Sequence, residues 1–600
     1  MTNHHYLTRP AQASAMALIL SLLLNCLVWT GFASPRATAR TARSRIGGVS
    51  DASTTAATPT VLVTSKADTD DHTCNAANCT LREAINAANS LAGDDVIGFA
   101  PGVTGVISLA TALPAISTNV QIAGPGADQL TVQRSGATGT PNFSVLRITA
   151  GAVAVSGLTI SGGATTTDGG GISNSGTLTL NSCTVTGNKS TQRGAGIYNA
   201  GQLTINDGTI SGNSVSGSQG GGGIFNSGTV TVSKSVISDN TSQGGGGIYN
   251  FSGTVTISGS TISGNQDVGI FGAGIYNNGS LTVTNSTVSG NGSSSGDGAG
   301  IYNNNACVVS SSTISGNTTR FGWGGGIFNR SSLTLSGSTI TNNSADVAGG
   351  TFNFGTVNIV NTIIAGNRVG SELPDVHGAY VSRGYNLIGN RGTFSSGLGA
   401  VGDKVGTPAA PLDPKLGPLA LNGGPTKTHA LLAGSPAIDQ GKCSEATSTD
   451  QRGVFRYDFS DLANADGGCD IGAFEAQALP LVSVNSVNAT EGDLGTSDLT
   501  FTVSLDHPAI TPVSVDYATE EFTALAGADY LTATGTLTLP AGTTAISFKV
   551  QIAGDTINEL NEAFLIRLSN PQGAFVRDPI GVGLIIDNDA VPASQSATLA

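Results

Sequence analysis

Seven of the acidic residues in the last fifth of this 600-residue chain are candidate cation ligands, and few basic residues accompany them. From Pro480 onward, 14 Asp and Glu residues stand against three Lys and Arg residues, in a chain whose formal net charge is −14. Carboxylates gathered without a basic partner raise one another's pKa unless a hard cation neutralises them. Ca²⁺ binds about six to eight oxygen atoms and suits loop ligands, so the pattern predicts a calcium site. The acids are Glu491, Asp529, Asp555, Glu559, Glu562, Asp587 and Asp589.

Short alternating segments between these acids must position them. Residues 499–503, 546–550 and 564–568 alternate apolar and polar side chains, which is typical of strands in a sandwich. The acids therefore fall in loops or at strand ends. The same excess of negative charge argues against a nucleic-acid partner, because neutralising phosphates requires Lys and Arg.

A different pattern occupies residues 169–367, where one unit recurs eight times. Each unit has a Gly-rich turn, a triplet such as Ile197-Tyr198-Asn199, and two short alternating segments. A second asparagine column recurs every 24 to 27 residues, which is the period of a solenoid. Its members are Asn188, Asn213, Asn240, Asn265, Asn291, Asn317, Asn343 and Asn367.

Each unit reads as three strands too short to stand alone, joined at bends that need glycine or asparagine. Coiling the units into a right-handed parallel β-helix pairs every strand with the coils above and below. Identical side chains then stack into Ile, aromatic and Asn ladders, and the amides can exchange hydrogen bonds. The repeat lacks the fixed leucines and helical return of a leucine-rich repeat. We therefore predict an all-β chain, with a parallel β-helix followed by an immunoglobulin-like sandwich.

The aromatic position of the triplet has two interpretations. If it faces outward it forms a stacking strip suited to sugar rings; if it faces inward it is ordinary core. Strict alternation after an inward Ile favours the outward position, and the strip is then a candidate glycan-binding surface. Its members are Tyr198, Phe225, Tyr249, Tyr276, Tyr302, Phe328 and Phe352.

Few residues of the repeats could catalyse a reaction. The acids are scattered, the bases stand on different coils, and no histidine occurs there. A polysaccharide lyase or glycosidase would need clustered carboxylates with a cation to stabilise developing charge. We therefore predict no enzymatic activity and keep a polysaccharide-processing enzyme as the alternative. The acids of the repeats are Asp207, Asp239, Asp267, Asp297 and Asp346.

The N-terminus and the cysteines indicate export. Residues 1–34 contain Arg9, an apolar stretch and small residues, as in a cleaved signal peptide. No later segment could cross a membrane. In an exported protein Cys74 with Cys79, and Cys443 with Cys469, are candidate disulfides. Cys183 and Cys307 stand five coils apart, or ~24 Å at the usual strand spacing, so we expect them to be buried and unpaired.

Four segments resemble known families. Residues 79–85 resemble the CSLREA-type motif of bacterial surface-exported β-helix proteins, and the repeats resemble pectate-lyase-like β-helices. Short motifs between Leu416 and Glu475 resemble a choice-of-anchor domain. Residues 481–589 resemble a Calx-β domain, an immunoglobulin-like sandwich.

The Calx-β resemblance implies a specific ligand set. Two departures are Gly554, where calcium-binding members often carry an acid, and Glu521-Phe522, where they carry Asp-Gly. Positions that match the calcium ligands of that family are Glu491, Asp529, Asp555, Glu559, Asp587 and Asp589.

These observations divide the chain into seven parts. They are a signal peptide (1–34), a linker (35–59), an N-terminal cap with the first coils (60–160), the β-helix repeats (161–400), a C-terminal cap (401–478), the Calx-β domain (480–590) and a tail (591–600). We expect a secreted or cell-surface protein for structural display and adhesion, whose partners are surface or matrix glycans or proteins. A passive stalk is a further alternative.

Overall fold

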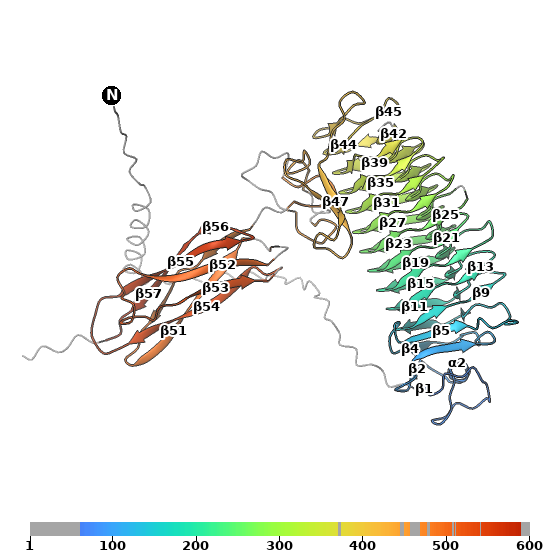
Figure 1. The fold of residues 1–600 in the computed structure, drawn as a ribbon, viewed down its shortest axis with the longest axis horizontal. Helices are drawn as coiled ribbons and strands as arrows, with labels where there is room; N and C mark the ends of the chain where they lie inside the picture. Colours follow the sequence, from blue (N-terminus) through green and yellow to red (C-terminus); the bar gives the residue numbers. More distant parts are fainter. Residues whose placement is uncertain are drawn as a thin grey trace, which may run out of the picture. The chain divides into compact units, whose positions relative to one another are not determined.

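The chain is almost entirely β-structure in its described part. The computed structural model describes residues 60–269, 271–369, 374–443, 449–456, 468–476, 480–506, 509, 512–540 and 542–589. The predicted signal peptide, linker and tail lie outside these residues. Residues 61–405 form a parallel β-coil, and residues 481–586 form two further sheets that are described separately (Figure 1).

One coil shows how the repeat folds. It contains β14 (Ile197–Asn199), β15 (Gln202–Asn206), β16 (Thr209–Ser211) and β17 (Ser214–Val215). The fourth strand was not predicted from the sequence, because its two residues show no alternation and only their pairing with the next coil defines them. Corresponding strands pair in parallel and in register, so the coils stack into sheets of 13, 11, 13 and 9 strands.

The 11-stranded sheet carries the triplets. Ile197 pairs with Ile224, Tyr198 with Phe225 and Asn199 with Asn226, and the register continues through the repeats. Its strands are β6 (Leu146–Ile148), β10 (Ile172–Asn174), β14, β18 (Ile224–Asn226), β22 (Ile248–Asn250), β26 (Ile275–Asn277), β30 (Ile301–Asn303), β34 (Ile327–Asn329), β38 (Thr351–Asn353), β42 (Val376–Ala379) and β45 (Ser395–Ser396).

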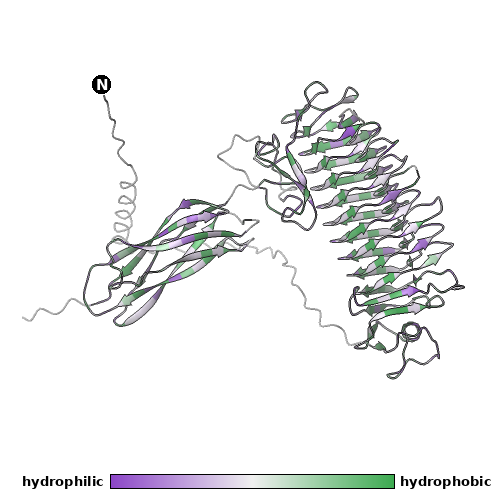
Figure 2. Ribbon diagram, viewed as in Figure 1, coloured by the Kyte–Doolittle hydropathy of each residue, from purple (hydrophilic) through white to green (hydrophobic). Residues whose placement is uncertain are grey.

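Hydrophobic strand segments recur on successive coils (Figure 2), and their buried side chains fill the coil together with two asparagine ladders. The isoleucines of the triplets are fully buried, and so are most of the asparagines beside them. In the second ladder each side-chain amide donates to the Oδ1 atom of the next asparagine at 2.8 to 3.0 Å, from Asn188 to Asn367. The last amide, Asn367, donates to Asp375 at 2.8 Å. The predicted amide exchange is confirmed.

The N-terminal end of the coil is covered by α2 (Leu81–Ser90). Thr80 caps the helix in a capping box with Glu83, and Leu81, Ala84, Ile85 and Ala88 face the apolar core. Arg82 is 9% exposed and forms an ion pair of 2.6 Å with Asp68. Residues 80–90 thus supply the cap, its apolar face and the arginine of the ion pair that anchors it.

The described residues between 416 and 476, called the lateral domain, lie along the side of the coil. They contain β47 (Leu416–Ala420) and β48 (Thr428–Leu431) and contact the outer face of β28 (Thr287–Ser289), β32 (Thr313–Ser315) and β36 (Thr339–Thr341). Contacts include Thr287 Oγ1 to Lys427 O at 2.6 Å and Ser315 Oγ to His429 Nε2 at 2.8 Å. The sequence predicts an end cap here, but these contacts cover a lateral face, because small hydroxyl side chains let loops approach the sheet closely.

The cysteines are arranged as their positions suggest. Cys74 is bonded to Cys79, and Cys443 is bonded to Cys469. Cys183 and Cys307 are free and buried in the coil. One disulfide thus lies just before α2, and the other lies in the segment beside the coil.

Residues 481–586 form a sandwich-like pair of sheets around their own apolar core, which includes Phe501, Tyr530 and Phe564. The four-stranded sheet has the order β54 (Ala545–Gly554), β51 (Gly495–Leu505), β49 (Leu481–Val484) and β56 (Phe575–Asp578). The five-stranded sheet has the order β50 (Val487–Thr490), β57 (Ile580–Ile586), β55 (Glu562–Gln572), β52 (Val513–Glu521) and β53 (Thr534–Leu539).

Candidate metal centre

Strand pairing brings the predicted acids to one end of the sandwich. β50 runs parallel to β57, with Thr490 opposite Ile586, so the next residues, Glu491 and Asp587, leave the sheet at the same edge. β55 runs antiparallel to β57, which places its first residue, Glu562, opposite Ile585. Acids far apart in the sequence are therefore neighbours because their strands start or end together.

The carboxylates form two groups of three. In each group the nearest oxygen atoms lie within 4.8 Å of one another. The first group is Glu491, Asp587 and Asp589, and the second is Asp529, Glu559 and Glu562.

The predicted set and the observed groups differ at two positions. Asp555 belongs to neither group, although its charge contributes to raising the pKa of Glu491. Glu562, which was left out of the ligand set, lies beside Asp529. Asp493 was not singled out from the sequence, and it accepts a hydrogen bond from Asn588 Nδ2 at 2.7 Å. Its place directly after Glu491-Gly492, in the same turn, is the signal that could have identified it.

Neutral groups hold the loops in place around the acids. Asn558 Nδ2 donates to Asp587 Oδ2 at 3.0 Å and to the Asp589 carbonyl at 2.7 Å. The Glu559 N–H also donates to Asp587 Oδ2 at 3.0 Å, and the Gly492 N–H donates to Asn588 Oδ1 at 2.8 Å. The turns that carry the carboxylates are thus positioned by bonds that consume few of the acidic oxygens.

Burial and mutual repulsion disfavour the ionised acids. Glu491 is 9% exposed, and desolvation followed by the charges of Asp555, Asp587 and Asp589 raises its pKa to about 7. Burial, a hydrogen bond with Asp529 and the neighbouring charges also raise the pKa of Glu562 to about 7. A cation bound among these groups would relieve the repulsion.

No basic side chain among the described residues of the sandwich supplies that compensation. Lys549 is bound to Asp498 at 2.8 Å, and Arg567 is bound to Glu520 at 2.6 Å. Arg577 lies 4.0 Å from Asp578. All three cations are therefore engaged with acids outside the two groups.

The donor set fits a hard cation. Every group offers carboxylate oxygen, the ligand atom that Ca²⁺ prefers. Asp589 Oδ2 is buried and has no hydrogen-bond partner among the described residues. An unpaired buried carboxylate oxygen is costly, and coordination to a cation would satisfy it. The residues present thus fit calcium, with six acids in two adjoining groups.

The aromatic column is not the open strip that the sequence suggests. Its side chains alternate with buried Ile and Asn and so point out of the coil as predicted, but Phe225, Tyr276, Tyr302, Phe328 and Phe352 are at most 8% exposed. Tyr198 and Tyr249 are half-buried.

Loops that precede the triplets cover these rings. The Phe271 ring lies 5.0 Å from Tyr276, and the Trp323 ring lies 5.0 Å from Phe352. Gly220 approaches so closely that a Cβ atom there would lie 2.3 Å from Tyr249 Cδ2. The prediction of a continuous glycan-binding strip is therefore wrong, because alternation alone does not reveal how far these loops fold back.

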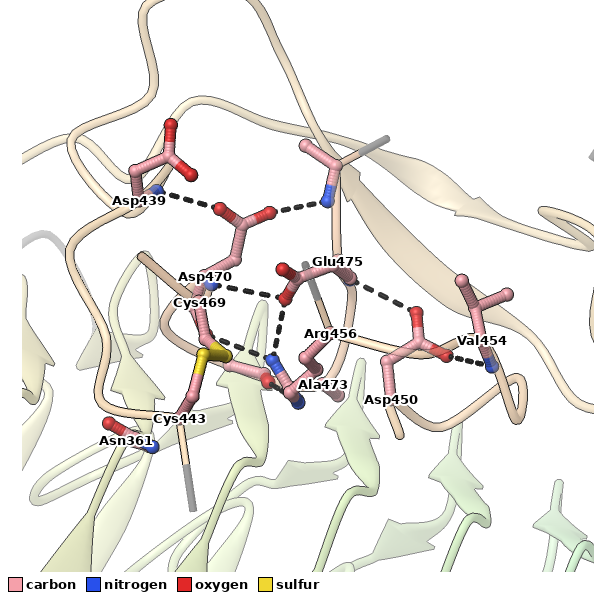
Figure 3. Close-up of polar contacts among 12 residues, drawn as sticks. Asn361, Asp439, Cys443, Asp450, Val454, Arg456, Cys469, Asp470, Ala473 and Glu475 are labelled. Atoms are coloured by element: carbon pink, nitrogen blue, oxygen red, sulfur yellow. Dashed lines mark hydrogen bonds and ion pairs between the residues drawn. A yellow bond between two sulfur atoms is a disulfide. The ribbon is translucent and has the colours of Figure 1, made fainter. Parts of the chain in front are cut away.

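Acids in the lateral domain form a closed network (Figure 3). Glu475 Oε2 accepts from Arg456 Nη1 and from the Asp470 N–H, both at 3.0 Å. Asp450 accepts from the Glu475 N–H at 3.0 Å and pairs at 2.6 Å with Arg452, and both side chains of that pair are fully buried. Burial raises the pKa of Asp470 and Glu475. These acids therefore hold loops of the lateral domain together.

Acids of the coil also accept hydrogen bonds within turns. Asp267 accepts from the N–H groups of Gly269 at 2.9 Å and Phe271 at 3.0 Å. Asp297 accepts from the Trp323 N–H at 2.8 Å. Among the described residues of the repeats, one Arg–Asp ion pair is present, between Arg193 and Asp168. Asp267 and Asp297 thus have local structural roles.

Two family models match parts of the chain. Residues 484–588 match the Calx-beta domain, and residues 144–294 match the right handed beta helix region. The protein therefore combines a parallel β-helix with a Calx-β domain in one all-β chain.

A curated relative and several solved structures are similar to parts of the chain. The sodium/calcium exchanger Calx of Drosophila melanogaster is 37% identical over 81 residues, which are 13% of this chain and 8% of that protein. The apo-form Calx CBD1 domain is 29% identical, with a TM-score of 0.16, and the match covers 18% of this chain and 99% of that one. Pectate lyase Pel9A is 11% identical, with a TM-score of 0.34, and the match covers 70% and 97%.

Proposed function

We propose that this chain is an exported structural and adhesion-type protein whose Calx-β domain binds Ca²⁺. The observation that carries the calcium part is the meeting of Glu491, Asp587 and Asp589 with Asp529, Glu559 and Glu562, away from every described basic side chain of the domain. The similarity to a sodium/calcium exchanger over 81 residues supports the same assignment.

Calcium would supply the positive charge that this end of the sandwich lacks. The acids come from the turn after β50, the segment after β57, the start of β55 and the loops before β53 and β55. A cation shared by these segments would tie loops of both sheets together. Its role is structural, since it would stiffen the module that follows the coil.

Calcium titration of the full chain tests this assignment. We expect a saturable heat of binding and a higher unfolding temperature of the Calx-β domain after EDTA-treated protein receives Ca²⁺. Mg²⁺ is the matched control, because it is smaller and demands octahedral geometry. Identical melting curves with EDTA and with excess Ca²⁺ would remove the calcium assignment.

The role in display and adhesion is supported by the architecture. Residues 79–85 fit the CSLREA-type motif of surface-exported proteins, and residues 416–475 carry the motifs of a choice-of-anchor domain. The apolar stretch within residues 1–34 fits a signal peptide. Within the described residues, no helix is long and apolar enough to cross a bilayer.

Cell fractionation tests export. We expect the full-length protein in the medium or on the cell surface, shortened at its N-terminus by about the length of a signal peptide. Mass spectrometry of the N-terminus measures this directly. Recovery of the intact N-terminus in the cytoplasmic fraction would contradict the proposal.

The non-enzymatic assignment rests on the scatter of the acids along the coil and on the hydrogen bonds that Asp267 and Asp297 accept from the backbone. A polysaccharide lyase or glycosidase is the alternative. Release of reducing sugar or unsaturated uronate from a polysaccharide panel would favour it.

A further inference from the structure

The aromatic column has one gap, at Ser173. The register runs through Arg147, Ser173, Tyr198 and Phe225, so that serine occupies the position at which the following coils carry a ring. From Tyr198 to Phe352 neighbouring rings have centroids 4.5 to 5.7 Å apart. Strands in a sheet lie about 4.8 Å apart, so about 9.6 Å separates the backbones of Arg147 and Tyr198. The column therefore lacks one ring.

The gap opens into a pocket of about 480 Å³. Tyr198 forms one side, Ser173 lies between it and Arg147, and Asn142, Thr167 and Asp168 add polar groups. This volume is within the usual range of small-ligand sites. By contrast, no ring is missing at the other end of the column, since His377 stacks on Phe352 with ring centroids 4.4 Å apart.

The two charged side chains of the pocket differ: Asp168 is held in place by a neighbouring arginine, whereas Arg147 has no polar partner among the described residues. Arg193 holds Asp168 through two hydrogen bonds, Nε to Oδ1 at 2.8 Å and Nη2 to Oδ2 at 2.6 Å. The same guanidinium lies 5.1 Å from the Tyr198 ring centroid, which keeps ring and carboxylate together. Arg147 is exposed and makes no side-chain hydrogen bond or ion pair with any described residue.

We propose that this slot, defined by Arg147, Ser173, Tyr198 and Asp168, binds one pyranose ring of a glycan. The apolar face of the sugar would stack on Tyr198 in place of the missing side chain. Its hydroxyl groups would donate to Asp168 and accept from Arg147. The lining is rich in hydroxyl and charged groups, which suits a polyhydroxylated ring better than an aromatic side chain from a partner protein.

This inference deepens the proposed adhesive role and rests on it, because it locates recognition at one slot instead of along the whole column. Binding of a single ring is expected to be weak, with a Kd on the order of 1 mM. A chain of sugars, or many copies of the protein on a surface, would raise the effective affinity.

Saturation-transfer NMR on the full chain tests the slot, with glucose, galactose, N-acetylglucosamine and glucuronate as probes. We expect at least one probe to bind. Ser173→Tyr restores the side chain that other coils carry at this position, so it should fold normally while weakening binding by about tenfold or more. Ser173→Ala keeps the space and should retain binding.

The Arg147→Gln variant shows whether Arg147 contacts a carboxylate, which only glucuronate carries among the probes, or hydroxyl groups, which all four sugars carry. A selective loss of glucuronate binding places a carboxylate on Arg147, and an equal loss of all probes places hydroxyl groups there; both support the slot. The inference is overturned if no probe binds the wild-type chain, or if Ser173→Tyr binds as the wild type does. Wild-type binding by Ser173→Tyr would refute only the location of the sugar site and would not contradict the proposed adhesive role. The calcium response of Ser173→Tyr, expected to be normal, reports separately on the Calx-β domain.

Discussion

The asparagine ladder of the coil and the carboxylate groups of the sandwich both bring similar polar side chains together. The side chains of the ladder satisfy one another's hydrogen bonds, whereas those of the sandwich do not. Asn265 donates its amide to Asn291 Oδ1 at 2.9 Å and accepts from Asn240 Nδ2 at 3.0 Å. Every rung thus satisfies the next. In the sandwich, Glu491, Asp587 and Asp589 bring three carboxylates together, and Asp589 Oδ2 has no partner among the described residues.

The difference follows from what each group can donate. An amide is donor and acceptor at once, so a column of amides closes on itself without a ligand. An ionised carboxylate only accepts, and a group of them needs donors or a cation from elsewhere. The lateral domain is the intermediate case, since Arg452 and Arg456 supply donors to Asp450 and Glu475. Gathered polar residues therefore indicate a ligand only when they cannot satisfy one another.

Replacing one asparagine of the ladder by aspartate should destabilise the coil, because it puts into the ladder the group that the sandwich gathers. Asn265→Asp replaces the donor to Asn291 Oδ1 and to the Ile237 carbonyl with a carboxylate oxygen that repels both acceptors, and it buries a charge with no cation to neutralise it. We expect a loss of about 3 to 5 kcal/mol in the stability of the coil. The measurement is the guanidinium midpoint of the coil's unfolding transition.

A matched control for that variant lies outside the ladder. Asn304 is exposed and donates to Asn278 Oδ1 at 2.7 Å. Asn304→Asp makes the same chemical change in contact with water, and we expect a shift within about 0.5 kcal/mol. Equal midpoints for the two variants would show that the ladder does not stabilise the coil.

The ladder could be predicted from the sequence because it depends only on the period. Residues one period apart must stack once the strands pair in register, so Asn188 and Asn213 meet whatever the loops do. The exposure of Tyr276 could not be predicted in this way. Phe271, from a loop whose length differs between coils, covers it, and periodicity carries no information about such a loop.

Removing one carboxylate ligand from the sandwich should reduce the stability that the domain gains from calcium. Free Ca²⁺ at 100 times its Kd stabilises a domain by about 2.7 kcal/mol, and Glu491→Gln should lose most of that gain because it removes a buried, charged ligand. The readout is the calcium-dependent shift in the unfolding temperature of the Calx-β domain in the full chain. Asp578→Asn changes an exposed acid outside both groups and should keep the full shift.

The ligand set itself was only partly predictable. Loop residues such as Glu491 and Asp587 could be chosen from their places at strand ends. Glu562 and Asp555 could not be ranked in this way, because pairing of β52 with β55 decides which of them meets Asp529, in the loop after β52. The separation into two groups depends on that pairing and not on spacing along the chain.

The smallest of the three effects is the pH dependence of the sandwich without calcium. Desolvation and neighbouring acids raise the pKa of Glu491 from 4.5 to about 7. Between these values the folded domain holds a proton that the unfolded chain has lost, so its stability falls as the pH rises from about 4.5 through about 7. We expect a decrease on the order of 1 kcal/mol over this range, measured by denaturant unfolding in EDTA.

Saturating calcium should reverse this trend, since the cation binds the ionised carboxylates and competes with the protons. Calcium affinity is then expected to fall as the pH drops below about 7, and Glu491→Gln should flatten the profile measured in EDTA. The coil provides the internal reference: its own buried acids, such as Asp375 at the end of the ladder, do not include Glu491, so substitution at Glu491 should leave the pH profile of the coil's transition unchanged. If the wild-type sandwich in EDTA instead gains stability between pH 5 and pH 8, the raised pKa of Glu491 is contradicted. The conclusion that this end of the domain lacks compensating positive charge would then fail as well.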